Sequence, residues 1–268
     1  NSGYIGSHLC KLLANDYDIT GLDINKPQCK IPNHIYHDIK NNFPMKKIHY
    51  DAVIHLAALV NVGESEQKPT EYYLTNFIGT LNLLTHVDTD NFIFASTGAA
   101  EYCQSVYGTS KRAAEDCVKE MCNFKKLPYT IFRFYNVIGS DGYKPTNPDG
   151  LMYNLLKAKD TEEFTIFGND YAESWDGTCV RDYVHVNEIC EALKMAIEKP
   201  SNQIECLGHG VGYTVKEMVH MFCEVNDMDL LIKYGPRRQG DLPASVLENV
   251  SPYMKNLYEI KDLLKVDK

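Results

Sequence analysis

Short apolar segments alternate with helical stretches through the first half of the chain, and this alternation limits the possible fold more than any other feature. The helical stretches begin near Ser7, Pro69 and Tyr107. Strands that alternate with helices in this way form βαβ units and a parallel sheet. We therefore predict an α/β protein with a Rossmann-type doubly wound parallel sheet, whose strands lie at 19–23, 34–37, 52–56, 92–96 and 129–134.

The pattern changes near residue 137, which indicates a second domain. Residues 139–150 are rich in Gly, Pro and Asn, as expected of a loop that closes over a ligand, and mixed short elements follow. At 268 residues the chain is long enough for one nucleotide-binding domain and a smaller lobe. We expect a Rossmann domain over residues 1–137. A mainly substrate-binding, mixed lobe should cover residues 138–268, with some segments returning to the first domain.

The start of the chain carries two glycines three residues apart, directly before an apolar helical run. Glycines at a helix start let backbone N–H groups approach a pyrophosphate, and the helix dipole favours negative charge there. This is only the end of a dinucleotide-binding fingerprint, so we expect a strand and a further glycine to precede Asn1 in the natural protein. The predicted turn consists of Gly3, Tyr4, Ile5 and Gly6.

An aspartate closes the next expected strand, twenty residues after Gly3. A carboxylate at this position accepts hydrogen bonds from the adenosine ribose hydroxyls and repels a 2′-phosphate. Asp23 therefore predicts NAD rather than NADP as the cofactor. The alternative interpretation is a glycine C-cap followed by a surface aspartate.

Tyr107 and Lys111 stand four residues apart at the head of a helical run, ten residues after Ser96 and Thr97 end a strand. This spacing places the phenol and the ammonium on one helix face, where the positive charge should lower the pKa of the tyrosine. Such a tyrosine can take a proton from an alcohol near neutral pH. On its own the pattern is more often an exposed pair on a helix, and the glycine turn and Asp23 favour the catalytic interpretation.

Composition excludes several classes of function. A net charge of -9 argues against nucleic acid and anionic membranes as partners, since both need a basic face. No apolar run reaches the ~18 residues needed to span a bilayer. The nine cysteines are spaced singly, without Cys-x-x-Cys or paired histidines, which is typical of reduced thiols in a cytoplasmic protein. We expect neither disulfides nor a metal site.

Eight segments spread along the chain form a recognisable set, at 3–8, 37–39, 53–58, 62–65, 107–111, 133–136, 177–186 and 236–243. The most specific are Gly-Thr-Cys-Val-Arg-Asp-Tyr-Val-His-Val at 177–186 and Pro-Arg-Arg-Gln-Gly-Asp at 236–241. Together they resemble the extended short-chain dehydrogenase/reductases and, within these, the UDP-glucose 4-epimerases. The resemblance covers essentially the whole chain and implies a UDP-sugar substrate, and we also expect a homodimer.

The resemblance also implies roles for individual residues. Around NAD, it places Asp38 and Ile39 at the adenine, Asn76 near the phosphates, and Leu56, Ala57, Ala58, Leu59 and Tyr135 along the cofactor. The uridine diphosphate and its ribose would be held by Asn136, Leu151, Arg181, Arg238 and Asp241. Forked, permanently charged guanidinium groups suit a diphosphate.

The reaction implied is epimerisation at C4 of the hexose. Tyr107 removes the proton of the 4-hydroxyl while the C4 hydride passes to NAD, and Thr97 hydrogen-bonds the same oxygen. The 4-keto sugar then swings about its diphosphate tether and takes the hydride back on its other face. By the same resemblance, Ser245 would lie at the edge of the hexose pocket. Because serine is small, the pocket should admit the N-acetyl forms as well as glucose and galactose.

Two other functions stay open. Related 4,6-dehydratases and decarboxylases need an acid directly after the strand-end Ser or Thr, but here Gly98 and Ala99 follow, and Glu101 is the first acid. A non-catalytic nucleotide-binding module would usually have lost part of the catalytic set, which is intact here. The chain also departs from the family pattern: Val60 replaces a lysine, Gly150 replaces an amide, and the interval between Thr97 and Tyr107 is short.

Overall fold

The computed structural model describes residues 1–41, 48–139, 142–238 and 240–266. Residues 140–141 of the expected loop and Gln239 of the 236–241 segment lie outside this part of the chain. Contacts divide the chain into two compact units, one of residues 1–134 with 190–205 and one of residues 135–189 with 206–268. Each unit contains a hydrophobic cluster of its own.

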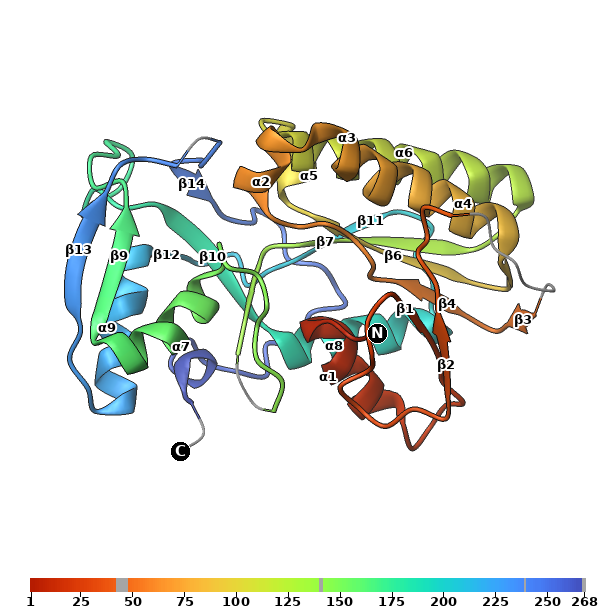
Figure 1. Cartoon of the computed structure of the whole chain (residues 1–268), viewed down its shortest axis with the longest axis horizontal. Helices are drawn as coiled ribbons and strands as arrows, with labels where there is room; N and C mark the ends of the chain where they lie inside the picture. Colours follow the sequence, from red (N-terminus) through yellow and green to blue (C-terminus); the bar gives the residue numbers. More distant parts are fainter. Residues whose placement is uncertain (42–47, 140–141, 239, 267–268) are drawn as a thin grey trace. The chain divides into compact units, whose positions relative to one another are not determined.

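A four-stranded sheet forms the centre of the first unit, in the order β11 (Ile204–Leu207), β7 (Tyr129–Phe134), β6 (Phe92–Thr97) and β4 (Val53–His55). Strand β6 runs parallel to both β4 and β7. Figure 1 shows α4 (Gly79–His86) and α6 (Val106–Lys125) over one face and α1 (Tyr4–Leu13) and α8 (Val186–Glu198) over the other. Strands covered on both faces read as continuous apolar runs, and β7 is buried at every position.

Two smaller parallel pairs also lie in the described part of this unit. They are β1 (Thr20–Asp23) with β2 (Asn33–Tyr36), and β3 (His49–Tyr50) with β5 (Asp88–Thr89). The five strands expected from sequence are confirmed: β7 has the expected bounds, and each end of β1, β2, β4 and β6 lies within one residue of its expected position. The predicted α/β class with a parallel Rossmann-like sheet is therefore confirmed.

A helical run lies between β4 and β5. It consists of α2 (Val62–Gln67), α3 (Pro69–Tyr72), a π-helical turn η1 (Tyr73–Ile78) and α4. Pro69 opens α3, where a missing N–H costs nothing. Short π-helical segments frequently occur at functional sites. A single turn, α5 (Ala99–Tyr102), spans half of the interval between β6 and α6.

The second unit is built on a mixed sheet around β10 (Val180–His185). Strand β10 pairs antiparallel with β12 (Gly212–Thr214) and parallel with β8 (Asn136–Ile138) and β14 (Ala244–Ser245). A separate parallel pair, β9 (Glu163–Phe167) with β13 (Leu231–Gly235), packs with α7 (Leu151–Thr161), α9 (Val215–Asn226) and the 3₁₀ turn η2 (Asp262–Leu264).

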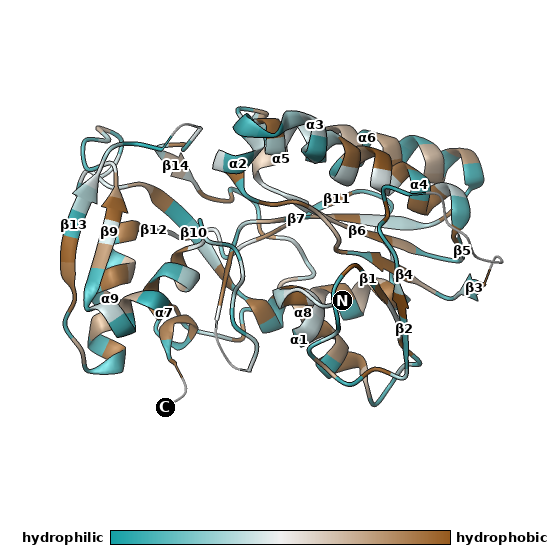
Figure 2. Cartoon of the chain, in the orientation of Figure 1, coloured by the Kyte–Doolittle hydropathy of each residue, from teal (hydrophilic) through white to brown (hydrophobic). Residues whose placement is uncertain are grey.

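Hydropathy follows the packing of the helices. Helices α6 and α9 carry alternating hydrophilic and hydrophobic bands (Figure 2), as helices with one buried face do. Val118 and Cys122 of α6 are fully buried in one cluster, and Met218 and Phe222 of α9 are fully buried in the other. Among the described residues, no helix is both long enough and apolar enough to cross a membrane.

Candidate active site

The residues predicted for catalysis lie in the first unit, and those predicted to hold the uridine diphosphate lie in the second. Tyr107 and Lys111 sit in the first two turns of α6, with 9% and 2% of their surfaces exposed. Thr97 ends β6, and its side chain lies near enough to the Tyr107 phenol to lower the pKa of that phenol. The structure thus brings the three predicted catalytic residues together.

The charge state of Tyr107 differs from the expectation. Burial raises the pKa of Tyr107 to about 12, although the nearby Thr97 side chain lowers it in part. Lys111 Nζ donates to the Ala95 carbonyl at 2.7 Å and lies 4.1 Å from the centre of the Phe94 ring. Burial lowers the pKa of Lys111 itself to about 7. The predicted lowering of the Tyr107 pKa by Lys111 is therefore wrong, because burial raises this pKa and Lys111 is not among the groups that lower it.

A close backbone approach explains how the short interval before Tyr107 is bridged. A Cβ on Gly108 would lie 2.6 Å from the carbonyl oxygen of Ala99, so only glycine allows α5 to lie against α6 at this point. The first turn of α6 is capped by Ser105, whose Oγ accepts a hydrogen bond from the Gly108 amide at 3.1 Å. The single turn of α5 therefore suffices to carry the chain from Thr97 to Tyr107.

Sequence reasoning missed a buried ionic cluster beside Lys111. Glu115 is fully buried, accepts two hydrogen bonds from Arg133, and accepts a third from Ser96 Oγ at 2.5 Å. Its charge raises the pKa of Lys111 and so opposes the larger effect of burial. The signal was present in the sequence, since Glu115 follows Lys111 by four residues and shares its helix face.

The start of α1 fits the pyrophosphate of a dinucleotide. Gly3 is the N-cap residue, no side chain caps this helix end, and a Cβ on Gly3 would meet open space. Uncapped amides at a helix N-terminus, unobstructed by a side chain, are suited to a phosphate group. A Cβ on Gly6, by contrast, would lie 2.8 Å from the Asn1 backbone. Tyr4 and Ile5 lie in the first turn and are partly exposed.

Asp23 ends β1 with a charged, oriented carboxylate. Its Oδ2 accepts from the Ser2 amide at 3.0 Å, and its Oδ1 accepts from the Asn25 amide at 2.9 Å. Burial raises its pKa, and the hydrogen bonds from the Ser2 and Asn25 amides lower it. An ionised carboxylate at this position is suited to ribose hydroxyls.

The other residues expected along NAD have these surroundings. Asp38 Oδ1 accepts from the Lys40 amide at 3.0 Å, and Ile39 is buried against Gly79. Leu56, Ala57 and Ala58 follow β4 at its carboxyl end and are partly exposed.

Asn76 lies in the π-helical turn, fully buried. Its Oδ1 accepts from the Leu59 amide at 2.8 Å, and its Nδ2 donates to Leu59 O and Ser110 Oγ, each at 3.0 Å. Asn76 therefore ties the backbone after β4 to α6, and its predicted place near the phosphates stays a prediction.

In the second unit, β10 gathers most of the residues predicted for the uridine diphosphate. Arg181 of β10 stands in register with Ser245 of β14, and Arg181 Nη2 lies 3.6 Å from Asp241 Oδ1. Asn136 begins β8 and donates from Nδ2 to the Asp182 carbonyl at 3.0 Å. Pairing of β10 with β8 and β14 thus collects residues that are far apart in sequence.

Arg238 and Leu151 complete the set predicted for the uridine diphosphate, and Tyr135, predicted along NAD, also belongs to this unit. The Arg238 guanidinium stacks 4.2 Å from the centre of the Phe167 ring, and its Nη1 donates to the Asp149 carbonyl at 3.2 Å. Leu151 is the first residue of α7, directly after Gly150, which is the N-cap. The Tyr135 amide donates to Leu207 at 3.1 Å.

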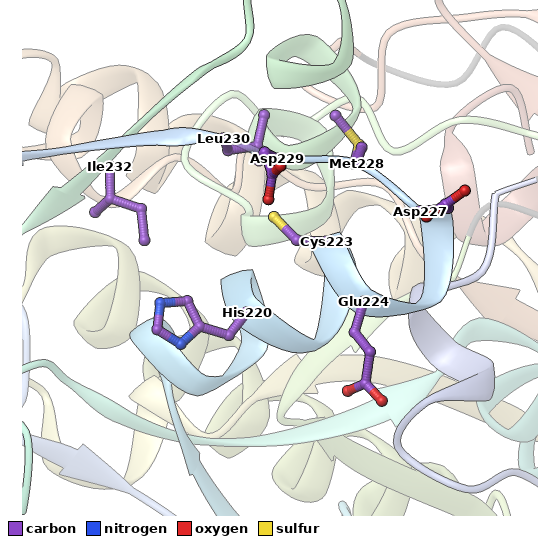
Figure 3. A pocket seen from close by; sticks show the side chains of 8 residues that line it. All are labelled: His220, Cys223, Glu224, Asp227, Met228, Asp229, Leu230 and Ile232. Atoms are coloured by element: carbon purple, nitrogen blue, oxygen red, sulfur yellow. The ribbon is translucent and has the colours of Figure 1, made fainter.

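A hollow of about 620 Å³ in the second unit lies elsewhere, against α9 and β13 (Figure 3). Its lining mixes acids with apolar side chains and contains none of the predicted site residues: His220, Cys223, Glu224, Asp227, Met228, Asp229, Leu230 and Ile232. Within the described ranges, His, Cys, Asp and Glu side chains do not gather in threes suited to a metal ion.

The chain is similar in sequence to a known protein family and to individual enzymes. The family described as "NAD dependent epimerase/dehydratase family" matches residues 1–206. The UDP-glucose 4-epimerase of Haemophilus influenzae is 32% identical over 289 residues, which cover 90% of this chain and 85% of that protein. The human UDP-glucose 4-epimerase is 33% identical over 230 residues, or 74% of this chain and 66% of that protein.

Two solved structures show the same fold. The UDP-glucose 4-epimerase of Bifidobacterium longum, in complex with NAD⁺ and UDP, superposes with a TM-score of 0.82 at 25% identity, over 98% of this chain and 93% of that one. The UDP-glucose 4-epimerase of Brucella ovis, in complex with NAD, gives a TM-score of 0.84 at 26% identity, over 98% of this chain and 94% of that one.

Proposed function

Because the chain belongs to the NAD-dependent epimerase/dehydratase family and is a UDP-glucose 4-epimerase-like enzyme, we propose that it interconverts UDP-glucose and UDP-galactose through a transient 4-keto sugar. The observation that carries this proposal is that Thr97, at the end of β6, lies beside the buried Tyr107 phenol, with Lys111 one turn beyond on the same helix. A phenol and a hydroxyl that lie side by side can both reach one substrate oxygen.

The first unit would hold NAD. The pyrophosphate would lie at the start of α1, on Gly3, Tyr4, Ile5 and Gly6, and Asp23 would accept hydrogen bonds from the adenosine ribose. Asp38 and Ile39 would contact the adenine, with Leu56, Ala57, Ala58 and Tyr135 along the rest of the cofactor. When bound, NAD supplies a hydride acceptor for C4 and a positive charge that favours the phenolate form of Tyr107.

Tyr107 would act as the base that takes the proton of the 4-hydroxyl and later returns it. Thr97 would hydrogen-bond to the same oxygen throughout. Lys111 would act through its protonated form, with its Nζ held by the Ala95 carbonyl. Burial of Tyr107 and Lys111 would exclude water from the proton transfer.

The second unit would hold the uridine diphosphate. Arg181 and Arg238 would contact the phosphates, since forked guanidinium groups bind phosphate oxygens in pairs. Stacking on Phe167 fixes Arg238, and Asp241 orients Arg181 from 3.6 Å. Asn136 and Leu151 would contact the nucleoside. A firmly held diphosphate and a loosely held hexose allow the keto sugar to turn over between the two hydride transfers.

Glu101, the first acid after Thr97, bears on the alternative chemistry. Its Oε2 lies 3.7 Å from Arg133 Nη1, beside the Glu115 ion pair. A carboxylate directed toward Arg133 is less suited to act on a 4-keto sugar. This contact supports epimerisation over elimination of water or loss of carbon dioxide.

Ser245 would set the breadth of the hexose pocket. It stands opposite Arg181 in the β10–β14 register and is only partly buried. The small side chain leaves room beside C2 of the sugar, so we extend the proposal to UDP-N-acetylglucosamine and UDP-N-acetylgalactosamine.

One assay tests the proposed function. The purified protein is incubated with UDP-galactose, and products are followed by NMR. Formation of UDP-glucose supports the proposal. A dehydrated keto sugar would make the protein a dehydratase, and no product from any UDP-hexose would make it a binding module. Running the same assay with UDP-N-acetylgalactosamine, on wild type and on Ser245→Tyr, tests the breadth of the pocket.

A further inference from the structure

The first turn of α6 is anchored from a different helix. The Tyr107 amide donates to Ser65 Oγ at 3.1 Å, and the Val106 amide donates to Glu66 Oε1 at 2.8 Å. The next amide, that of Gly108, donates to the local cap Ser105. The first amides of a helix have no partner inside the helix. Here two of them are satisfied by adjacent residues of α2, about 40 positions earlier in the chain.

Ser65 is held in place on both sides. It is fully buried, and its Oγ donates to the Val62 carbonyl at 2.6 Å while it accepts from the Tyr107 amide. A serine hydroxyl has one proton to donate, so this arrangement fixes its acceptor lone pairs toward α6. Removing the hydroxyl would leave the Tyr107 amide buried without a partner.

The same segment also bounds the Tyr107 ring. Tyr72, at the end of α3, is fully buried, and its ring centre lies 6.5 Å from that of Tyr107 at an angle of 82°. Its hydroxyl donates to the Asn61 carbonyl at 2.6 Å and reaches Glu64 Oε2 at 3.2 Å, which closes the segment from 61 to 72 on itself. Both the backbone and the ring of Tyr107 therefore rest on one preorganised segment.

We propose that Ser65 and Glu66 are positioning residues, which fix the first turn of α6 so that the Tyr107 phenol meets Thr97 in the geometry needed for proton transfer. The proposal rests on the proposed function, because it takes Tyr107 to be the catalytic base. It also gives a role to Val-Gly-Glu-Ser at 62–65, which is one of the eight segments of the family resemblance but had no predicted role. A displacement of ~1 Å in a reacting group can cost up to ~10²-fold in rate.

The test compares Ser65→Ala with Asn91→Ala. Asn91 is buried in the same unit, and its Nδ2 donates to the Ala196 and Ile197 carbonyls rather than to α6. Its loss should therefore lower the melting temperature without removing a hydrogen bond to the first turn of α6. For each variant, kcat and KM with UDP-galactose, the Kd for NAD, the melting temperature and backbone hydrogen exchange of residues 105–110 are measured. Ser65→Ala should lower kcat about tenfold or more, with KM and Kd within about twofold, and should speed exchange in that peptide.

A second pair of variants avoids any question of folding, because Glu66 is exposed. Glu66→Gln keeps an oxygen that can accept from the Val106 amide, so it should retain more of the kcat than Glu66→Ala. The positioning role is overturned if Ser65→Ala keeps kcat within about twofold of wild type. It is also overturned if Asn91→Ala, at an equal loss of melting temperature, lowers kcat as much. If wild type turns over no UDP-hexose but Ser65→Ala still speeds hydrogen exchange at 105–110, the proposed function is contradicted. The anchoring of Tyr107 by Ser65 is then still supported.

Discussion

Arg133 and Glu115 form a two-pronged ion pair inside the first unit, with Nε donating to Oε1 at 2.9 Å and Nη2 donating to Oε2 at 2.8 Å. The pair joins β7 to α6 one turn beyond Lys111. Ser96, at the end of β6, donates to the same carboxylate. Three neighbouring elements that carry or adjoin the candidate catalytic residues are therefore held together by one buried carboxylate.

Removal of one partner should be costly. Glu115→Ala removes the carboxylate that accepts two hydrogen bonds from the buried Arg133 charge, and should lower the free energy of unfolding by about 3–5 kcal/mol. Glu120→Ala, an exposed glutamate of the same helix, should change it by less than ~0.5 kcal/mol. Urea unfolding measures both free energies. Equal losses in the two variants would show that the buried pair contributes no more to stability than an exposed glutamate does.

Gly108 should not tolerate a side chain. In Gly108→Ala the new Cβ would lie 2.6 Å from the Ala99 carbonyl, so α5 or α6 must shift, at a cost of about 1–3 kcal/mol, and kcat should fall. Gly63→Ala is the matched control. Its Cβ would lie 3.7 Å from Asn61 Oδ1, which is ordinary contact. This substitution should therefore leave the free energy of unfolding unchanged or raise it by up to ~1 kcal/mol. Thermal unfolding of Gly108→Ala at the wild-type temperature would contradict the close approach.

Lys111 should make stability depend on pH. Burial lowers its pKa from near 10.5 to about 7. Between these values the unfolded chain binds a proton that the folded chain has released, so this group adds stability as pH rises through that window. Wild type should therefore gain stability relative to Lys111→Met between about pH 7 and pH 9.5. Denaturant unfolding of both proteins across that range measures the difference, and a difference independent of pH would refute the lowered pKa.

Asp23 should select the cofactor. Wild type should bind NAD more tightly than NADP by calorimetry, because the carboxylate repels a 2′-phosphate. Asp23→Asn keeps the oxygen that accepts from Asn25 but removes the charge, so the preference should shrink. Asp18→Asn removes the same charge from an exposed position and should leave the preference unchanged. Tighter binding of NADP by wild type would rule out the ribose role of Asp23.

The sequence predicted the features whose cause is local. Strand β7 has the expected bounds because an apolar run buried on both faces is recognisable from the chain alone. Tyr107 and Lys111 share a face because helical spacing requires it. The NAD-dependent family and the α/β fold likewise followed from short motifs.

The features it could not predict depend on contacts between distant residues. Ser65 supports Tyr107 across 42 positions, and its short polar helix carries no periodic signal. The Tyr107 pKa was misjudged because spacing reveals the neighbouring charge of Lys111 but not the depth of burial. The pairing of Arg181 with Ser245 arises only when β10 and β14 meet.

The most direct test of the account is the turnover of UDP-galactose by wild type and Tyr107→Phe, with NAD and UDP binding measured in parallel. The phenylalanine ring still packs against Tyr72, but no base remains to take the 4-hydroxyl proton. We expect wild type to form UDP-glucose and kcat to fall by ~10²–10⁴-fold in the variant, with both binding constants nearly unchanged. A variant that keeps more than about a tenth of wild-type kcat would contradict the assignment of Tyr107 as the catalytic base.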